Sequence, residues 1–202
     1  MTPAAGIART LSTPSGPASV LLSGSGPGLL VLGHGAGGGT EAVDLRAASE
    51  AGLAAGFRVA LVEQPWRVAG RRVAEASRRL DAVWVAVLTE LGGGEPLVVG
   101  GRSAGARVAC RTAGQVGADA VLCLAFPLHP PARPERSRAG ELASVDLPML
   151  VLQGGRDAFG MPDRAVVVAG ADHGFRVRRG DPDPAVQIAE AVGDWLLGLA
   201  RG

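Results

Sequence analysis

The sequence predicts an α/β fold, in which a mostly parallel, doubly wound β-sheet is covered by helices on both faces. Apolar runs without polar alternation, such as 28–33 and 147–152, recur along the chain and are typical of strands that are buried on both sides. Longer stretches between them carry apolar residues at three-to-four spacing, which indicates amphipathic helices. Because strands and helices alternate through most of the chain, we expect parallel strands joined by crossover helices.

The first half of the chain predicts an edge hairpin followed by two strand–helix units. Residues 7–12 and 17–22 flank a Thr-Pro-Ser-Gly turn signal, which favours an antiparallel hairpin at the edge of a sheet. A strand over 28–33 and a helix over 40–55 follow, and Thr40 is the expected N-cap of that helix. The remaining elements of this half are a strand over 57–62 and a helix over 71–91, whose apolar residues share one stripe.

The second half continues the alternation. A buried strand over 97–100 leads into a helix that begins at Ala104 and is rich in small residues. A C-terminal helix is expected after Asp183, an N-cap residue, with Pro184 in its first turn. The other predicted strands cover 120–124, 147–152 and 164–169.

The composition limits the possible classes of protein. The length of 202 residues and a hydrophobic fraction of 47% favour one globular domain, 1–202, and a net charge of +1 argues against a nucleic-acid partner. No stretch has the length and apolarity of a membrane span or a signal peptide, so no membrane partner is expected. Cys110 and Cys123 lack metal-ligand spacing and are expected to be buried thiols of a cytoplasmic protein.

One motif combines a strand end, two glycines and a serine. Gly101-Arg102-Ser103-Ala104-Gly105 matches G-x-S-x-G, a strained turn that raises a serine hydroxyl between a strand and a helix. Glycine is needed on both sides because strand and helix approach closely there. The alternative interpretation is a Gly-Ser loop in which Ser103 only caps the helix.

Candidate partners for that serine follow other predicted strands. Asp157 comes after the strand ending at Leu152, and His173 comes after the last strand. In a parallel sheet such positions meet at the carboxyl edge. A nucleophilic hydroxyl needs a base and an orienting carboxylate, so these residues are candidates for both; Glu63 is a rival acid.

Four motifs follow predicted strands: His34-Gly-Ala-Gly-Gly38, Gly101-Arg-Ser-Ala-Gly105, Leu152-Gln-Gly-Gly-Arg-Asp157 and Gly170-Ala-Asp-His-Gly-Phe175. With these motifs the chain resembles the α/β-hydrolases, and within them a small lidless group that includes dienelactone hydrolases. It resembles testis-expressed-protein-type hydrolase domains more closely, through Phe126-Pro-Leu-His-Pro-Pro131 with Pro134-Glu135 and through Gln153-Gly-Gly-Arg-Asp157-Ala-Phe-Gly160. Dienelactone hydrolases have a cysteine where this chain has Ser103.

The resemblance implies roles for particular residues. Ser103 would be the nucleophile, His173 the general base and then acid, and Asp157 the partner of the histidine. The backbone N–H groups of Ala36 and Ala104 would form the oxyanion hole. No metal or organic cofactor is implied, and the connection between 124 and 148 is too short for a lid domain.

Five further residues are candidates for contact with the substrate: His34, Trp66, Arg102, Phe126 and Phe159. The aromatic residues could equally be core, and the arginines a solvated face. The predicted activity is hydrolysis of a small ester or related acyl bond through an acyl-enzyme. The alternatives are a binding or scaffold protein that keeps the fold without turnover, and an acyltransferase.

Overall fold

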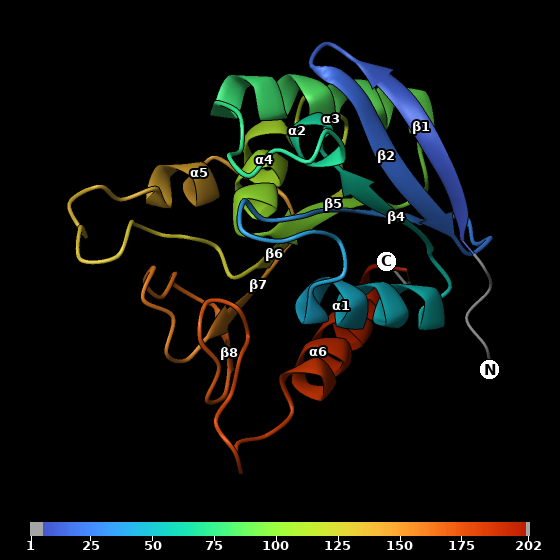
Figure 1. The fold of residues 1–202 in the computed structure, drawn as a ribbon. Coiled ribbons are helices and arrows are strands. Elements are labelled where there is room, and N and C mark those ends of the chain that lie inside the picture. The colour runs from blue at the N-terminus through green and yellow to red at the C-terminus, as the bar shows by residue number, and fades with distance from the viewer. Residues whose placement is uncertain (1–5, 201–202) are drawn as a thin grey trace.

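The centre of the fold is an eight-stranded sheet, seen in a computed structural model that describes residues 6–200 (Figure 1). The strand order is β1-β2-β4-β3-β5-β6-β7-β8. The strands are β1 (Ile7–Thr13), β2 (Gly16–Ser23), β3 (Leu29–Gly33), β4 (Arg58–Glu63), β5 (Leu97–Arg102), β6 (Ala120–Leu124), β7 (Met149–Gly154) and β8 (Val166–Val168).

The sheet is mostly parallel, as predicted. Strands β1 and β2 form an antiparallel hairpin, β2 pairs antiparallel with β4, and all pairs from β4 to β8 are parallel. Strands β3, β5 and β6 are buried almost throughout and contain no alternating polar face. Continuous burial explains why their sequences read as uninterrupted apolar runs.

Helices cover both faces of the sheet (Figure 1). On one face α1 packs against α6, and Leu45, Ile188 and Val192 are buried in the core there. On the other face α2, α3 and α4 enclose a second core around Trp66 and Trp84. The helices are α1 (Val43–Ala54), α2 (Pro65–Val68), α3 (Ser77–Leu91), α4 (Ala104–Thr112), α5 (Ala139–Ala143) and α6 (Pro184–Leu199).

Two predicted helix starts are wrong. The helix expected from Thr40 begins at Val43, and its N-cap position is Ala42, which makes no side-chain cap. The helix expected over 71–91 begins only at Ser77, because Leu80 is the first residue of its stripe that reaches the core and Val73 is 80% exposed. The short helix α2 was not predicted.

The C-terminal half follows the prediction more closely. Asp183 caps α6 by accepting a hydrogen bond from the backbone N–H of Ala185, as expected. The last strand covers only Val166–Val168 rather than 164–169. The connection between β6 and β7, which lies entirely within the described residues, contains a single helix, the five-residue α5. This connection therefore carries no lid domain.

The topology creates a crevice at one point of the sheet edge. The chain leaves β3 through α1 toward β4 on one side, and β5 lies on the other side of β3. Loops that leave two neighbouring strands in opposite directions open a crevice at their carboxyl ends, where ligands bind in such sheets. Here those loops begin with His34 and Ser103. Within residues 6–200, none of the helices combines the length and apolarity needed to cross a membrane.

Candidate active site

Ser103 occupies a strained turn between β5 and α4. Its backbone angles are φ 52° and ψ −105°, a region that a residue with a side chain adopts only where its surroundings enforce it. The strand and helix approach so closely that a Cβ on Gly105 would lie 2.7 Å from the carbonyl carbon of Gly33. A Cβ on Gly101 would press on the carbonyl oxygen of Gly33. Both glycines of the G-x-S-x-G motif are therefore required by space.

His173 lies beside the serine, on the loop that follows β8. The Ser103 hydroxyl is 3.0 Å from His173 Nε2 and can donate its proton to that nitrogen. The loop is held by Asp172, whose Oδ1 accepts hydrogen bonds from the backbone N–H groups of Gly174 and Arg176. Asp172 therefore shapes the loop and leaves the imidazole to another carboxylate.

That carboxylate is Asp157, which follows β7. Its Oδ2 lies 2.8 Å from His173 Nδ1, and its side chain is fully buried. With Nδ1–H donating to the carboxylate, Nε2 is free to accept the proton of the serine hydroxyl. The rival acid Glu63, at the end of β4, instead forms an ion pair with Arg67 of α2, with 3.6 Å between Glu63 Oε1 and Arg67 Nε.

The carboxylate is itself fixed by groups that sequence reasoning missed. Gln153, fully buried at the end of β7, donates from Nε2 to Asp157 Oδ2 at 2.8 Å. The same nitrogen lies within hydrogen-bond distance of the carbonyl oxygens of Phe126 and Gly160. The only signal in the sequence is a polar residue at the end of an apolar strand. Asp157 Oδ1 accepts the backbone N–H of Phe159 at 2.8 Å.

The two candidate oxyanion donors flank the same crevice. Ala104 is the first residue of α4, where a backbone N–H has no partner within the helix. Ala36 is exposed on the loop after β3. Within residues 6–200 neither N–H donates a hydrogen bond. Two backbone donors and the positive end of a helix are thus available to a negative charge next to Ser103.

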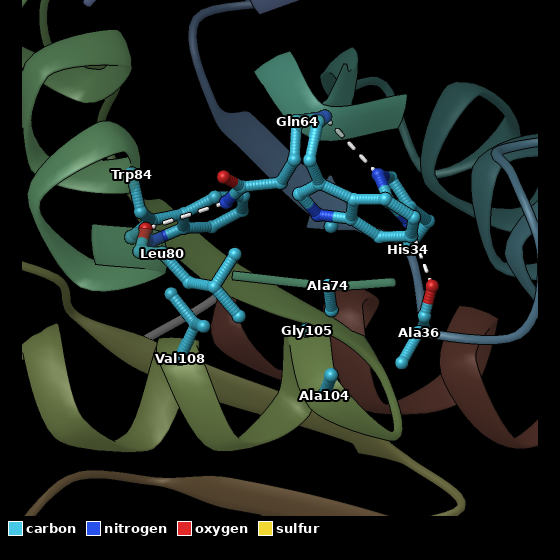
Figure 2. A pocket seen from close by; sticks show the side chains of 12 residues that line it. His34, Ala36, Gln64, Ala74, Leu80, Trp84, Ala104, Gly105 and Val108 are labelled. Atoms are coloured by element: carbon cyan, nitrogen blue, oxygen red, sulfur yellow. Dashed lines mark hydrogen bonds between the residues drawn. The ribbon is translucent and has the colours of Figure 1, made fainter. Parts of the chain in front are cut away.

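His34 fixes the loop that carries Ala36. Its Nε2 accepts the backbone N–H of Gln64 at 3.0 Å, so Nδ1 carries the hydrogen and donates to the carbonyl oxygen of Gly35 at 2.8 Å (Figure 2). Burial lowers the pKa of this imidazole below its ordinary value, which keeps it neutral. Trp66 packs edge-on against its ring at a centroid distance of 5.4 Å. These hydrogen bonds and the ring contact do not involve Ser103.

Arg102 points away from solvent, into a buried ion pair with Asp44 of α1. The Asp44 side chain is fully buried, and burial raises the pKa of its carboxyl from 3.8 to about 6 against the opposing effect of Arg102. Sequence reasoning missed Asp44, which reads as an exposed acidic residue in the first turn of a helix. With its side chain only 13% exposed, Arg102 is engaged within the protein.

The other two candidate contacts are divided between site and core. Phe159 stacks on His173, with ring centroids 4.1 Å apart and an interplanar angle of 30°. Phe126 is fully buried in the core on the α3 side, and its carbonyl oxygen accepts from Gln153. The Phe126 side chain is therefore a core residue rather than a contact for the substrate. Among the described residues there is no group of three or more His, Cys, Asp or Glu that could hold a metal ion.

The sequence of the chain matches a known protein family, and its fold matches solved structures. A family model described as "Alpha/beta hydrolase domain" matches residues 27–192. The structure of XC6422 from Xanthomonas campestris, an α/β serine hydrolase without lid, matches with a TM-score of 0.74 and 19% identity over 97% of this chain and 95% of that one. Dienelactone hydrolase from Anabaena variabilis matches with a TM-score of 0.73 and 19% identity over 96% and 97%.

A third neighbour has a similar fold at lower identity. Est1E from Butyrivibrio proteoclasticus, solved with ferulic acid bound, matches with a TM-score of 0.76 and 14% identity over 96% of this chain and 100% of that one. A search of curated protein sequences gave no match. At these identities the solved structures establish the fold. Because the family model covers most of the chain and includes Ser103, Asp157 and His173, the chain belongs to the α/β hydrolase family.

Proposed function

We propose that the chain is a serine hydrolase that cleaves a small ester or related acyl bond through an acyl-enzyme. The observation that carries this proposal is the hydrogen-bonded series from the Ser103 hydroxyl to His173 Nε2 at 3.0 Å and from His173 Nδ1 to Asp157 Oδ2 at 2.8 Å. Membership of the α/β hydrolase family supports it. So do the two free N–H groups beside Ser103, since acyl transfer needs donors where negative charge develops.

In the first half-reaction Ser103 Oγ attacks the carbonyl carbon while its proton passes to His173 Nε2. The electrons of the carbonyl double bond move to its oxygen, which the N–H groups of Ala36 and Ala104 stabilise. When this intermediate collapses, the bond to the leaving group breaks. The leaving oxygen takes the proton from Nε2, and the acyl group stays on Oγ.

The second half-reaction repeats these steps with water. A water molecule attacks the acyl carbon and gives a proton to His173 Nε2. Collapse breaks the bond to Ser103 Oγ, which recovers that proton, and the acid is released. Asp157 stabilises the positively charged imidazole in both halves and keeps Nδ1 protonated.

The test is covalent labelling by a fluorophosphonate at neutral pH. The wild type is expected to be labelled at Ser103, and Ser103→Ala is expected not to react. Ser144→Ala is the matched control, because Ser144 is an exposed serine at the end of α5, where its hydroxyl donates to the carbonyl oxygen of Glu141. It should react like the wild type.

A second arm separates labelling from turnover. Hydrolysis of 4-nitrophenyl acetate is expected for the wild type and for Ser144→Ala, and its loss is expected for Ser103→Ala and His173→Ala. Circular dichroism and thermal unfolding show that each variant is folded. A folded wild type that neither reacts with the probe nor turns over the ester would contradict the proposal and favour a scaffold or binding protein that keeps the fold.

A further inference from the structure

A small pocket begins at the two candidate oxyanion donors and ends in the core under α3. At one end it is bounded by Ala36 and Ala104, and at the other by Leu80 and Trp84 of α3 and Val108 of α4 (Figure 2). We call it the α3 pocket. An oxygen bound by the two N–H groups would place its carbonyl carbon at the mouth of this pocket. The pocket therefore lies next to the position of a group attached to that carbon.

The order of the strands decides which part of a substrate lies on this side. Ser103 follows β5, while His173 follows β8, on one side of β5 in the sheet. The α3 pocket is built from residues after β3 and β4, on the other side, together with α3 and α4. The leaving group takes its proton from His173 Nε2 and must lie toward the histidine. Because the leaving group occupies the histidine side, the acyl substituent lies on the side of the α3 pocket.

The size of the pocket limits what it can hold. The volume open to the centre of a water-sized sphere is about 10 Å³, which is room for about one water molecule. Leu80, Trp84 and Val108 are at most 8% exposed, and the close-packed core around them resists displacement. We therefore expect one group of the size of a methyl to fit beyond the carbonyl carbon, and a longer chain to collide with these walls.

The chemistry of the walls selects a neutral group. The residues that line the α3 pocket, all within the described part of the chain, include no Arg, Lys, Asp or Glu, and His34 is kept neutral by burial. Gln64 Nε2 uses one of its two hydrogens to donate to the carbonyl oxygen of Leu80. Two buried lining residues also contain a polar atom without a partner among the described residues, Gln64 Oε1 and Trp84 Nε1. An uncharged acyl group is thus compatible with these walls, whereas a charged one is not.

We infer that the α3 pocket is the acyl subsite, and that Leu80, Trp84 and Val108 restrict the substrate to esters of the neutral acetyl group. This inference rests on the proposed hydrolase function and adds the substrate class to it. The alcohol or other leaving group lies on the open side next to His173, where the β6–β7 connection carries no lid domain.

The test measures kcat/KM for 4-nitrophenyl acetate, butyrate and octanoate, which share one leaving group. Acetate is expected to exceed butyrate by about tenfold or more, since a single methylene group changes discrimination by about 10–200-fold. Leu80→Ala should raise the butyrate-to-acetate ratio by about tenfold. The matched control is Leu88→Ala, which removes a leucine from the same helix and core, 5% exposed, that does not line the pocket.

A second variant narrows the pocket instead of enlarging it. Ala74 lines the pocket from a partly buried position in the loop before α3, so Ala74→Val narrows the space without a cavity in the core. It is expected to lower kcat/KM for acetate by about tenfold. This variant keeps the inference testable if Leu80→Ala does not fold.

The outcomes separate this inference from the proposed function. Fluorophosphonate labelling together with equal kcat/KM for acetate, butyrate and octanoate overturns the acyl subsite and leaves the hydrolase intact. Equal changes in the chain-length ratio for Leu80→Ala and Leu88→Ala overturn it as well. If the folded wild type shows no labelling and no turnover, the proposed function fails and the acyl subsite fails with it.

Discussion

The guanidinium of Arg102 lies 3.2 Å from the buried carboxylate of Asp44, measured from Nε to Oδ2. Neither atom has a well-aligned hydrogen bond among the described residues, so the pair is held by charge attraction. Arg102 Nη2 also donates to the carbonyl oxygen of His173 at 3.1 Å. One side chain, next to Ser103 in sequence, thus joins α1 to the loop of the histidine.

Removing the arginine is expected to leave an unpaired charge in the core. Arg102→Met should lower the free energy of unfolding by about 3–5 kcal/mol at pH 8, the cost typical of breaking a buried pair. The double variant with Asp44→Asn should recover a large part of that loss, because no buried charge then remains. Urea denaturation of the two single variants and the double variant measures this coupling. Additive losses in the double variant would contradict it.

The titration of Asp44 gives a pH-dependent prediction. Its pKa is raised from 3.8 to about 6 in the fold, so the folded state binds the proton more tightly than the unfolded state. The unfolding free energy therefore decreases as the pH rises through that window. Relative to Asp44→Asn, which does not titrate there, the wild type should lose about 2 kcal/mol between pH 4 and pH 7. The ionisable groups facing Asp44 are Arg102 and His173, and both are retained in the variant.

The measurement is urea denaturation of the wild type and Asp44→Asn at several pH values. Groups common to both proteins cancel in the difference between their unfolding free energies. A difference that stays constant from pH 4 to pH 7 would show that Asp44 titrates normally in the fold.

The sheet and the candidate residues Ser103, Asp157 and His173 could be predicted because each is marked by a short local sequence pattern. Continuous apolar runs mark the buried strands, and the elbow glycines, Asp157 and His173 each follow a strand within a few residues. Parallel topology then requires those strand ends to share one edge. Local pattern and global fold agree at these positions.

The parts that were missed depend on contacts between distant segments. Asp44 forms an ion pair with Arg102, and Gln153 Nε2 contacts Asp157 and two backbone carbonyl oxygens. Neither arrangement has a periodic signature in the sequence. The start of α3 was placed too early because Val73 continues the apolar spacing of the stripe while its side chain remains in solvent. Arg102 looked available to a substrate for the same reason, since its buried partner lies on another element.

Gln153→Met is expected to reduce turnover while leaving substrate binding nearly unchanged. The variant keeps the approximate volume of the side chain and removes the donor to Asp157 Oδ2. A hydrogen bond to a charged group contributes about 1.5–3 kcal/mol, so kcat should fall about 10–100-fold. KM should change little, because Gln153 is buried beneath the carboxylate and away from the crevice. Steady-state kinetics with 4-nitrophenyl acetate measures both.

Gln115→Met is the control for that substitution, because Gln115 is an exposed residue in the turn after α4. It is expected to match the wild type in kcat and KM. A rise in KM with unchanged kcat for Gln153→Met would contradict the positioning role.

Gly105→Ala tests whether the approach of α4 to β3 fixes the serine. The added Cβ would lie 2.7 Å from the carbonyl carbon of Gly33, so the helix must move away and Ser103 must move with it. We expect a loss of about 1–3 kcal/mol in unfolding free energy and a reduced rate of fluorophosphonate labelling. Gly193→Ala in α6, where nothing lies within 4 Å of the added Cβ, should instead stabilise the protein by up to about 1 kcal/mol and label normally. Because both variants make the same chemical change within a helix, opposite effects on unfolding isolate the contact with Gly33, whereas equal effects would show that the elbow tolerates a side chain there.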